Sequence, residues 1–293
     1  MTVPGSPDVA TIYERGYRRY DGPRTGVRGA VRSLVVHSLR HAVGLGRSAR
    51  HKVVALAIIL MAYIPAVIIV GAVAILPITQ EFLPSYAEYY GTVAATLYLL
   101  AGFAAPELLC RDRRTGMLGV YLASPLTRLT YLVGKGTAMV IMMLTVTFGP
   151  PLLLLLAHTL QGIGPDGFGN WLEVLWIMIV AGIVIGGLYA LIAMAVSAST
   201  DRVVVATAAI LALIPGSGLV TDALVLEAGL SPQLRLLNLL FLPRALVYRL
   251  YHDTGGWPSA TNPTWSLWLA ILAWAALAVA WIWFCYRRLQ VRR

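Results

Sequence analysis

Residues 106–137, PELLCRDRRTGMLGVYLASPLTRLTYLVGKGT, join two long apolar stretches of the chain. This connector becomes basic from Arg111, is interrupted at Ser124-Pro125, and returns to apolar sequence after Lys135. A flexible loop would be polar and rich in Gly and Ser, whereas this one carries large apolar side chains at Met117, Leu118, Val120, Tyr121, Leu122 and Leu126. Such side chains are stabilised by burial against a surface. We therefore expect a structured connector, 111–130, that lies on another protein.

The sequence around the connector is far more apolar than that of a soluble protein. Hydrophobic residues make up 58% of the 293 residues and charged residues 12%, whereas about 25% of the residues in a typical soluble domain are charged. The mean hydropathy is +0.75. The first apolar stretch, Val53–Leu76, has 24 residues without a charge, and a helix of that length, about 36 Å, exceeds the hydrocarbon thickness of about 30 Å. The chain is thus predicted to be an all-α integral membrane protein.

Six membrane spans are predicted, and the basic residues orient them. The spans are Val53–Leu76, Gly91–Cys110, Tyr131–Ala157, Trp171–Thr200, Val203 to about Thr221, and Trp265–Tyr286. Of the 23 Lys and Arg residues, 20 lie before the first span, in the connector, at Arg202 or at the end of the chain, and the loops 77–90 and 160–170 hold none. Cytoplasmic loops carry the excess of Lys and Arg. Both termini and the connector are therefore predicted to be cytoplasmic, in a multi-pass protein of the cell membrane.

The net charge of +10 is then a signal of orientation and of attraction to anionic headgroups. No soluble basic face predicts a nucleic-acid partner. The partner that this charge distribution predicts is the lipid bilayer.

The two ends of the chain are predicted to lie outside the six-span domain, 53–286. Residues 1–52 form a cytoplasmic segment in which Arg24–Lys52 is predicted to be an interfacial helix. Its basic residues include Arg28 and Arg32, and its apolar side includes Val27, Val31, Leu34, Val35, Leu39 and Ala42. Residues 287–293 are predicted to be a basic cytoplasmic tail.

Several residues at the ends of the spans carry local predictions. Glu107 and Arg111 are four residues apart and are predicted to pair at the membrane edge, and Lys135 is expected to reach the lipid headgroups. Pro150-Pro151 should kink or break the third span. Residues 215–218, PGSG, are expected to end the fifth span.

Two further features concern packing and topology. Gly182 and Gly186 have the spacing that lets two helices approach closely; a packing seam within the chain is favoured, and a dimer interface is the alternative. The segment 224–263 has an apolar run too short and too charged to span a membrane. It is predicted to be an extracytoplasmic re-entrant or interfacial element.

The connector resembles the first cytoplasmic loop of ABC exporter permeases of the type-two membrane family. The resemblance rests on Glu107, Arg111-Asp112-Arg113-Arg114, Thr115-Gly116, Leu118, Ser124-Pro125-Leu126, Arg128, Tyr131 and Gly134-Lys135. In addition, YRRYDGPRT at 17–25 is similar to a signature that precedes the membrane domain in some of these permeases.

The resemblance implies a coupling helix between spans two and three, an N-terminal elbow helix, and docking of a separate ABC ATPase. Two ATPase copies would serve a transporter that contains a second copy of this permease or a homologous one. The implied docking residues are Arg111, Asp112, Arg113, Arg114, Leu118, Tyr121, Leu122 and Arg128. Leu118, Tyr121 and Leu122 would form the buried anchor and the arginines its rim. The substrate is left open.

No catalytic or cofactor site is predicted on this chain. Gly134-Lys135-Gly136-Thr137 lacks the upstream Gly of a phosphate loop and has Gly where Ser or Thr must follow Lys, so ATP and Mg²⁺ are expected on the partner. His37 and His41 lack a third ligand, and no metal is predicted. The span interiors carry no Lys, Arg or His, which argues against ion-coupled transport. The alternatives are a non-transporting membrane scaffold or assembly factor and, third, a membrane-embedded lipid-modifying enzyme.

Overall fold

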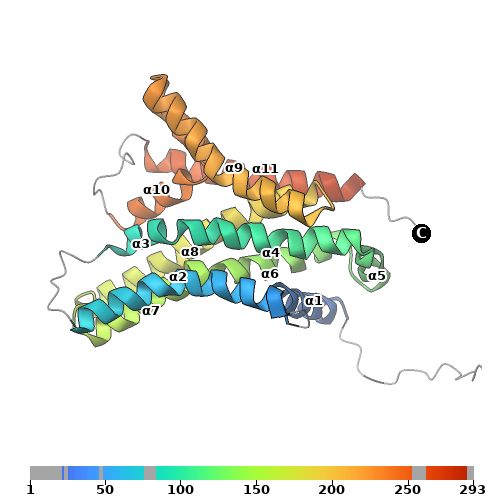
Figure 1. Ribbon diagram of the computed structural model, residues 1–293, viewed down its shortest axis with the longest axis horizontal. Helices are drawn as coiled ribbons and strands as arrows, with labels where there is room; N and C mark the ends of the chain where they lie inside the picture. Colours follow the sequence, from blue (N-terminus) through green and yellow to red (C-terminus); the bar gives the residue numbers. More distant parts are fainter. Residues whose placement is uncertain (1–21, 23–25, 46–48, 76–83, 253–261, 289–293) are drawn as a thin grey trace, which may run out of the picture.

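The computed structural model describes residues 22, 26–45, 49–75, 84–252 and 262–288. Within these ranges all regular structure is helical and there is no strand. The helices form an elongated bundle (Figure 1). By length and apolarity, five of the described helical segments could cross a membrane, and a sixth could do so if one bent pair of helices is counted as a span. The prediction of an all-helical membrane protein is confirmed, and five or six spans agree with the predicted layout.

Three of these segments are single long helices. They are α2 (Ala49–Ile75), α8 (Gly167–Ala198) and α11 (Thr264–Arg288). Helix α8 is the central one, because it packs against α4, α6, α9, α10 and α11. Residues in the second half of α8, such as Tyr189 and Ala193, are fully buried.

The second and third predicted spans are each made of two helices. Helix α3 (Tyr86–Thr92) meets α4 (Ala94–Arg114) at an angle of 52°. Helix α6 (Arg128–Thr147) is followed by α7 (Gly149–Leu160), and Pro150 and Pro151 lie in the first turn of α7. Proline is tolerated in a first turn because the N–H that it lacks would have no partner there. The predicted interruption of the third span is confirmed at Phe148.

The predicted interfacial helix is shorter than expected. Helix α1 (Gly26–Ala42) ends before Gly44, whose φ of 84° lies in the left-handed region that ends helices, and α2 begins separately at Ala49. Leu34 is buried and Val35 and Leu39 are half-buried, whereas Arg28, Arg32 and Val27 are exposed. Val27 therefore does not belong to the face that packs on the bundle. Residues 17–21, 23–25 and 289–293 lie outside the described residues.

The fifth span continues through its proline, contrary to prediction. Helix α9 (Val203–Asp222) contains Pro215 and runs on into a π-helical turn, Ala223–Glu227. Ser217 Oγ donates to the carbonyl of Ile214 and Thr221 Oγ1 to that of Ser217, at 2.7 and 2.8 Å. These bonds add to the hydrogen bonding of the helix after the proline, although the carbonyl that Pro215 leaves without its i−4 donor is that of Leu211. Residues 215–218 therefore do not break the helix.

The segment 224–252 contains short elements only. After the π-helical turn come a 3-10 helix, η3 (Pro232–Leu237), and α10 (Phe241–Leu250). Helix α10 packs on α11, α8 and α3. None of these elements is long enough to cross a membrane, as predicted for 224–263; residues 253–261 lie outside the described part.

Gly182 and Gly186 face α6 of the same chain. A Cβ added to Gly186 would lie 3.0 Å from Met143 Cβ, and one added to Gly182 would lie 3.4 Å from Thr147 Oγ1. Thr147 Oγ1 donates to the carbonyl of Gly182 at 3.1 Å. The two glycines thus allow α6 and α8 to approach closely inside the bundle.

The connector between spans two and three as the candidate functional site

The connector consists of one short helix held between two helix ends. Helix α4 takes up the first basic residues and ends at Arg114, and α6 begins at Arg128. Between them lies α5 (Met117–Ala123). Gly116 precedes α5 with φ of 72°, a left-handed conformation in which residues with a Cβ are strained. This reversal turns the chain back along the end of the bundle, where Figure 1 also shows α1 and the last turn of α11.

A capping box starts the helix that follows the connector. Thr127 Oγ1 accepts from the backbone N of Thr130 at 3.2 Å, and Thr130 Oγ1 accepts from the backbone N of Thr127 at 2.8 Å. These two bonds satisfy N–H groups that the first turn of a helix leaves without partners. The return of the chain into α6 is thereby fixed at Thr127.

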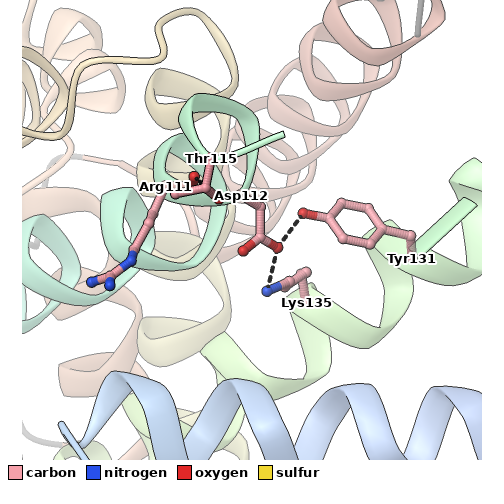
Figure 2. A network of polar contacts seen from close by, with 5 residues as sticks. All are labelled: Arg111, Asp112, Thr115, Tyr131 and Lys135. Atoms are coloured by element: carbon pink, nitrogen blue, oxygen red, sulfur yellow. Dashed lines mark hydrogen bonds and ion pairs between the residues drawn. The ribbon is translucent and has the colours of Figure 1, made fainter. Parts of the chain in front are cut away.

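A buried ion pair joins the two helices that flank the connector (Figure 2). Lys135 Nζ of α6 lies 2.7 Å from Asp112 Oδ2 of α4, and Tyr131 Oη donates to the same oxygen at 2.9 Å. The Lys135 side chain is 3% exposed and that of Asp112 is 13% exposed. The expectation that Lys135 reaches the lipid headgroups is therefore wrong. Lys135 faces inward because Asp112 offers a carboxylate where a lone buried ammonium would be costly.

Aromatic rings surround this ion pair. Lys135 Nζ lies 5.5 Å from the centroid of the Tyr121 ring and 5.7 Å from that of Tyr131, within the range of a cation–π contact. The Tyr131 ring lies between those of Tyr121 and Tyr286, with centroid distances of 5.7 and 6.0 Å. Burial and the charge of Asp112 raise the pKa of Tyr121 above its usual value, so its phenol stays neutral at physiological pH. This set of rings connects α5 to α6 and α11.

The two sides of α5 differ in what they contact. Leu118 and Tyr121 are half-buried and pack against the core of the bundle, and Leu122 is also half-buried. Met117 and Val120 point away, with 38% and 62% of their surface exposed. The apolar groups that remain available to another protein on α5 are therefore Met117 and Val120.

The basic residues of the connector also differ in their surroundings. Arg113 donates through Nη1 to the carbonyls of Ala198 and Thr200, where α8 turns into α9. Arg128 Nη1 donates to the carbonyl of Arg287 at the end of α11, at 3.2 Å. Arg111 Nη1 lies 3.7 Å from Glu107 Oε2, as a pair one helical turn apart, whereas Arg114 is exposed. Arg113 and Arg128 therefore tie the connector to the remaining helix ends.

Sequence reasoning missed the ion pair at the centre of this site. Asp112 and Lys135 lie on opposite sides of α5 in the sequence. Asp112 stands among arginines, which suggests a solvated surface, and Lys135 stands at the start of an apolar span, which suggests an interfacial position. One signal was available: Asp112 is the only acid between Arg111 and Lys135. An isolated acid between two apolar spans calls for a cationic partner at the same membrane depth.

The comparisons with known proteins agree with this architecture. The sequence model described as "ABC-2 family transporter protein" matches residues 75–286, a region that contains the connector and the described helices from α3 to most of α11. No curated protein matches the chain. Since the match covers well over half of the 293 residues, the chain belongs to the ABC-2 family of transporter proteins, whose members are membrane components of ABC transporters.

Proposed function

We propose that this protein is the permease subunit of an ATP-driven exporter, and that α5 is the coupling helix on which a separate ATPase docks. The permease would form the translocation pathway together with a second copy of itself or a homologous permease. Two ATPase copies would hold ATP and Mg²⁺ and carry out hydrolysis. In this arrangement six spans cross the cell membrane, with α3 and α4 counted as one, and both termini are cytoplasmic. The distribution of Lys and Arg supports this orientation.

The observation that carries the proposal is the outward side of α5. Met117 and Val120 are exposed on a helix whose other side packs against the bundle. The exposed Arg114 lies close to them in sequence. An apolar centre with a charged rim is the usual composition of a protein interface. Leu118 and Tyr121, which the sequence suggested as the anchor, are better suited to holding α5 on the bundle.

A coupling role also requires that movement of α5 reach the spans. The Asp112–Lys135 pair links α4 to α6, Arg113 links the connector to the turn between α8 and α9, and Arg128 links it to α11. A push on α5 would therefore act on several spans together. ATP-driven closure of the two ATPases would supply that push and change which side of the membrane the pathway faces.

Val120→Asp tests the docking surface. It places a charge at the centre of the proposed interface without touching the bundle. We expect at least a tenfold loss of ATPase that co-purifies with the permease, together with loss of transport-linked ATP hydrolysis in proteoliposomes. The ATPase is identified by peptide mass spectrometry of the purified complex.

Val27→Asp is the matched control, because Val27 is an exposed valine of α1 at the same end of the bundle. It should leave ATPase binding unchanged. Retention of the ATPase by Val120→Asp would refute docking through this side of α5. Equal losses in the two variants would show a general effect of added negative charge and would also refute it.

A further inference from the structure

A second buried cation lies at the opposite end of the bundle from the connector. Arg235, in η3, is only 7% exposed, yet no carboxylate of the described residues lies within ion-pairing distance of its guanidinium. The backbone carbonyl of Arg235 accepts a hydrogen bond from Asn238 N at 3.1 Å. Burial of an arginine without an anionic partner is costly. Some compensating group is therefore expected at this position.

Arg235 lines a cavity of about 400 Å³ between α9 and the η3–α10 segment. Figure 1 shows the last part of α9 diverging from the bundle on this side. Most of the lining is apolar: Pro215, Leu219, Leu226, Leu240 and Phe241. Leu219 and Leu226 are 76% and 70% exposed, so the rim of the cavity is apolar as well. A ligand that fits must combine an apolar part with a polar group that reaches Arg235.

Asn238 adds hydrogen-bond donors to the same cavity. Its Oδ1 accepts from the backbone N of Leu240 and Phe241 at 3.0 and 2.8 Å. Two backbone donors require the oxygen at this position, so the Nδ2 group is on the other side of the amide. Asn238 lines the cavity beside Gly218. The Nδ2 donors and the Arg235 guanidinium both favour an acceptor-rich ligand group.

The charge of the cavity selects an anion. Arg235 and Arg244 line it with one acid, Asp222, so its net formal charge is +1. Arg244 also lies against Gly91 of α3, where an added Cβ would come within 2.6 Å of Nη2. Asp222 is exposed and forms no ion pair with Arg235 in the described part of the chain. A guanidinium binds the oxygens of a phosphate through two parallel hydrogen bonds.

The position of the cavity along the membrane helix fits a lipid. The helical segment Val203–Glu227 is 25 residues long, about 37 Å at 1.5 Å per residue, which is more than the hydrocarbon thickness of about 30 Å. The cavity lies along its second half. Basic pockets between membrane helices are a known way to hold phosphate-bearing headgroups.

We propose that this cavity binds an anionic phospholipid from the leaflet opposite the connector, with the phosphate at Arg235 and Asn238. One acyl chain would lie along the apolar lining formed by Pro215 and Leu219. The inference requires only that the chain lies in a membrane, and it makes no assumption about what the transporter carries.

Native mass spectrometry of the delipidated full-length protein tests the site, because it counts bound lipids and subunits in one spectrum. The probes are dioleoylphosphatidylglycerol, dioleoylglycerol, which lacks the phosphate, and inorganic phosphate. We expect the wild-type protein to bind phosphatidylglycerol at least tenfold more tightly than dioleoylglycerol. Arg235→Gln should weaken phosphatidylglycerol binding about tenfold and leave dioleoylglycerol binding unchanged.

Two further variants serve as a charge-matched control and as an independent test of the cavity. Arg249→Gln removes the same charge from α10, but Arg249 does not line the cavity and its Nη2 donates to the carbonyl of Asn262; lipid affinity should stay within twofold of wild type. Leu219→Trp keeps the charges and fills the cavity from an exposed position, so it should also weaken binding, even if Arg235→Gln proved unstable.

Several results would overturn the proposal. Equal weakening by Arg235→Gln and Arg249→Gln would show a non-specific charge effect. Competition by inorganic phosphate at the concentration that saturates the lipid would show a site for a free anion. A change in subunit number with an unchanged lipid count would show that the cavity is an interface between copies of the chain.

Discussion

The two ends of the bundle each bury a cation, and the surroundings of the two cations differ. Lys135, beside the connector, has 3% of its surface exposed, and Arg235, at the opposite end, has 7%. Lys135 is paired with Asp112 and surrounded by tyrosine rings, whereas Arg235 faces a cavity and has no carboxylate partner among the described residues. Similar burial can therefore indicate either an internal structural link or a site for a ligand.

The difference agrees with the mechanical demands on each end. If the connector receives force as proposed, it would have to hold its helices together through both states of a transport cycle, and the ion pair between α4 and α6 would do so without a ligand. The cavity beside the end of α9 could accept a lipid, because Arg235 lines it and has no carboxylate partner among the described residues. Variants that remove each charge in turn test this contrast.

The largest effect is expected at the connector. Asp112→Asn keeps the shape of the side chain but leaves the Lys135 ammonium buried without its counter-charge. Breaking a buried pair in this way costs about 3–5 kcal/mol. The free energy of unfolding, measured by dodecyl sulfate titration in mixed micelles, should fall by that amount. Lys135→Met should cost less, because Asp112 is more exposed and retains the hydrogen bond from Tyr131.

Two control variants separate the effect of the buried pair from that of the substitution itself. Asp201→Asn is the same substitution at an exposed position in the turn between α8 and α9, and it should change the free energy of unfolding by no more than about 0.5 kcal/mol. Combining Asp112→Asn with Lys135→Met should recover most of the loss. Equal losses for Asp112→Asn and Asp201→Asn would show that the buried pair does not stabilise the connector.

Sequence alone predicted the parts of this molecule that depend on local composition. Apolar segments located the spans, because transfer into a membrane depends mainly on the residues of each segment. The same reasoning identified the connector as structured and Pro150-Pro151 as an interruption. The family also became apparent from the connector motif, and the match over 75–286 confirmed it.

The features that sequence reasoning missed depend on contacts between distant residues. Lys135 resembles an interfacial residue until α4 brings Asp112 against it. Pro215 resembles a helix breaker, yet α9 runs through it to Asp222. Arg235 is one of three basic residues between 224 and 263, and its burial follows from how η3 packs beside α9. None of these contacts has a periodic signature.

An intermediate effect is expected midway between the two ends, where α6 packs on α8. Gly186→Ala would bring a Cβ to 3.0 Å from Met143 Cβ, whereas a Cβ at Gly187 would meet nothing within 4 Å. Both changes raise helix propensity equally, so the difference between the variants isolates the contact. The free energy of unfolding should be about 1–3 kcal/mol lower for Gly186→Ala than for Gly187→Ala.

The result bears on how the ends are connected. A close α6–α8 contact would let a displacement at Lys135 reach the central helix. Equal free energies of unfolding for the two glycine variants would show that the close approach at Gly186 does not determine how α6 packs on α8.

The smallest change in stability is expected from Arg235→Met. This variant removes a buried charge that has no counter-charge among the described residues, so in lipid-free micelles the free energy of unfolding should stay within about 0.5 kcal/mol of wild type or increase. Phosphatidylglycerol at ten times its dissociation constant should stabilise the wild-type protein by about 1.4 kcal/mol and the variant by much less. A loss for Arg235→Met without lipid as large as that for Asp112→Asn would make Arg235 a structural residue, and the two ends of the bundle would then bury their cations for the same reason.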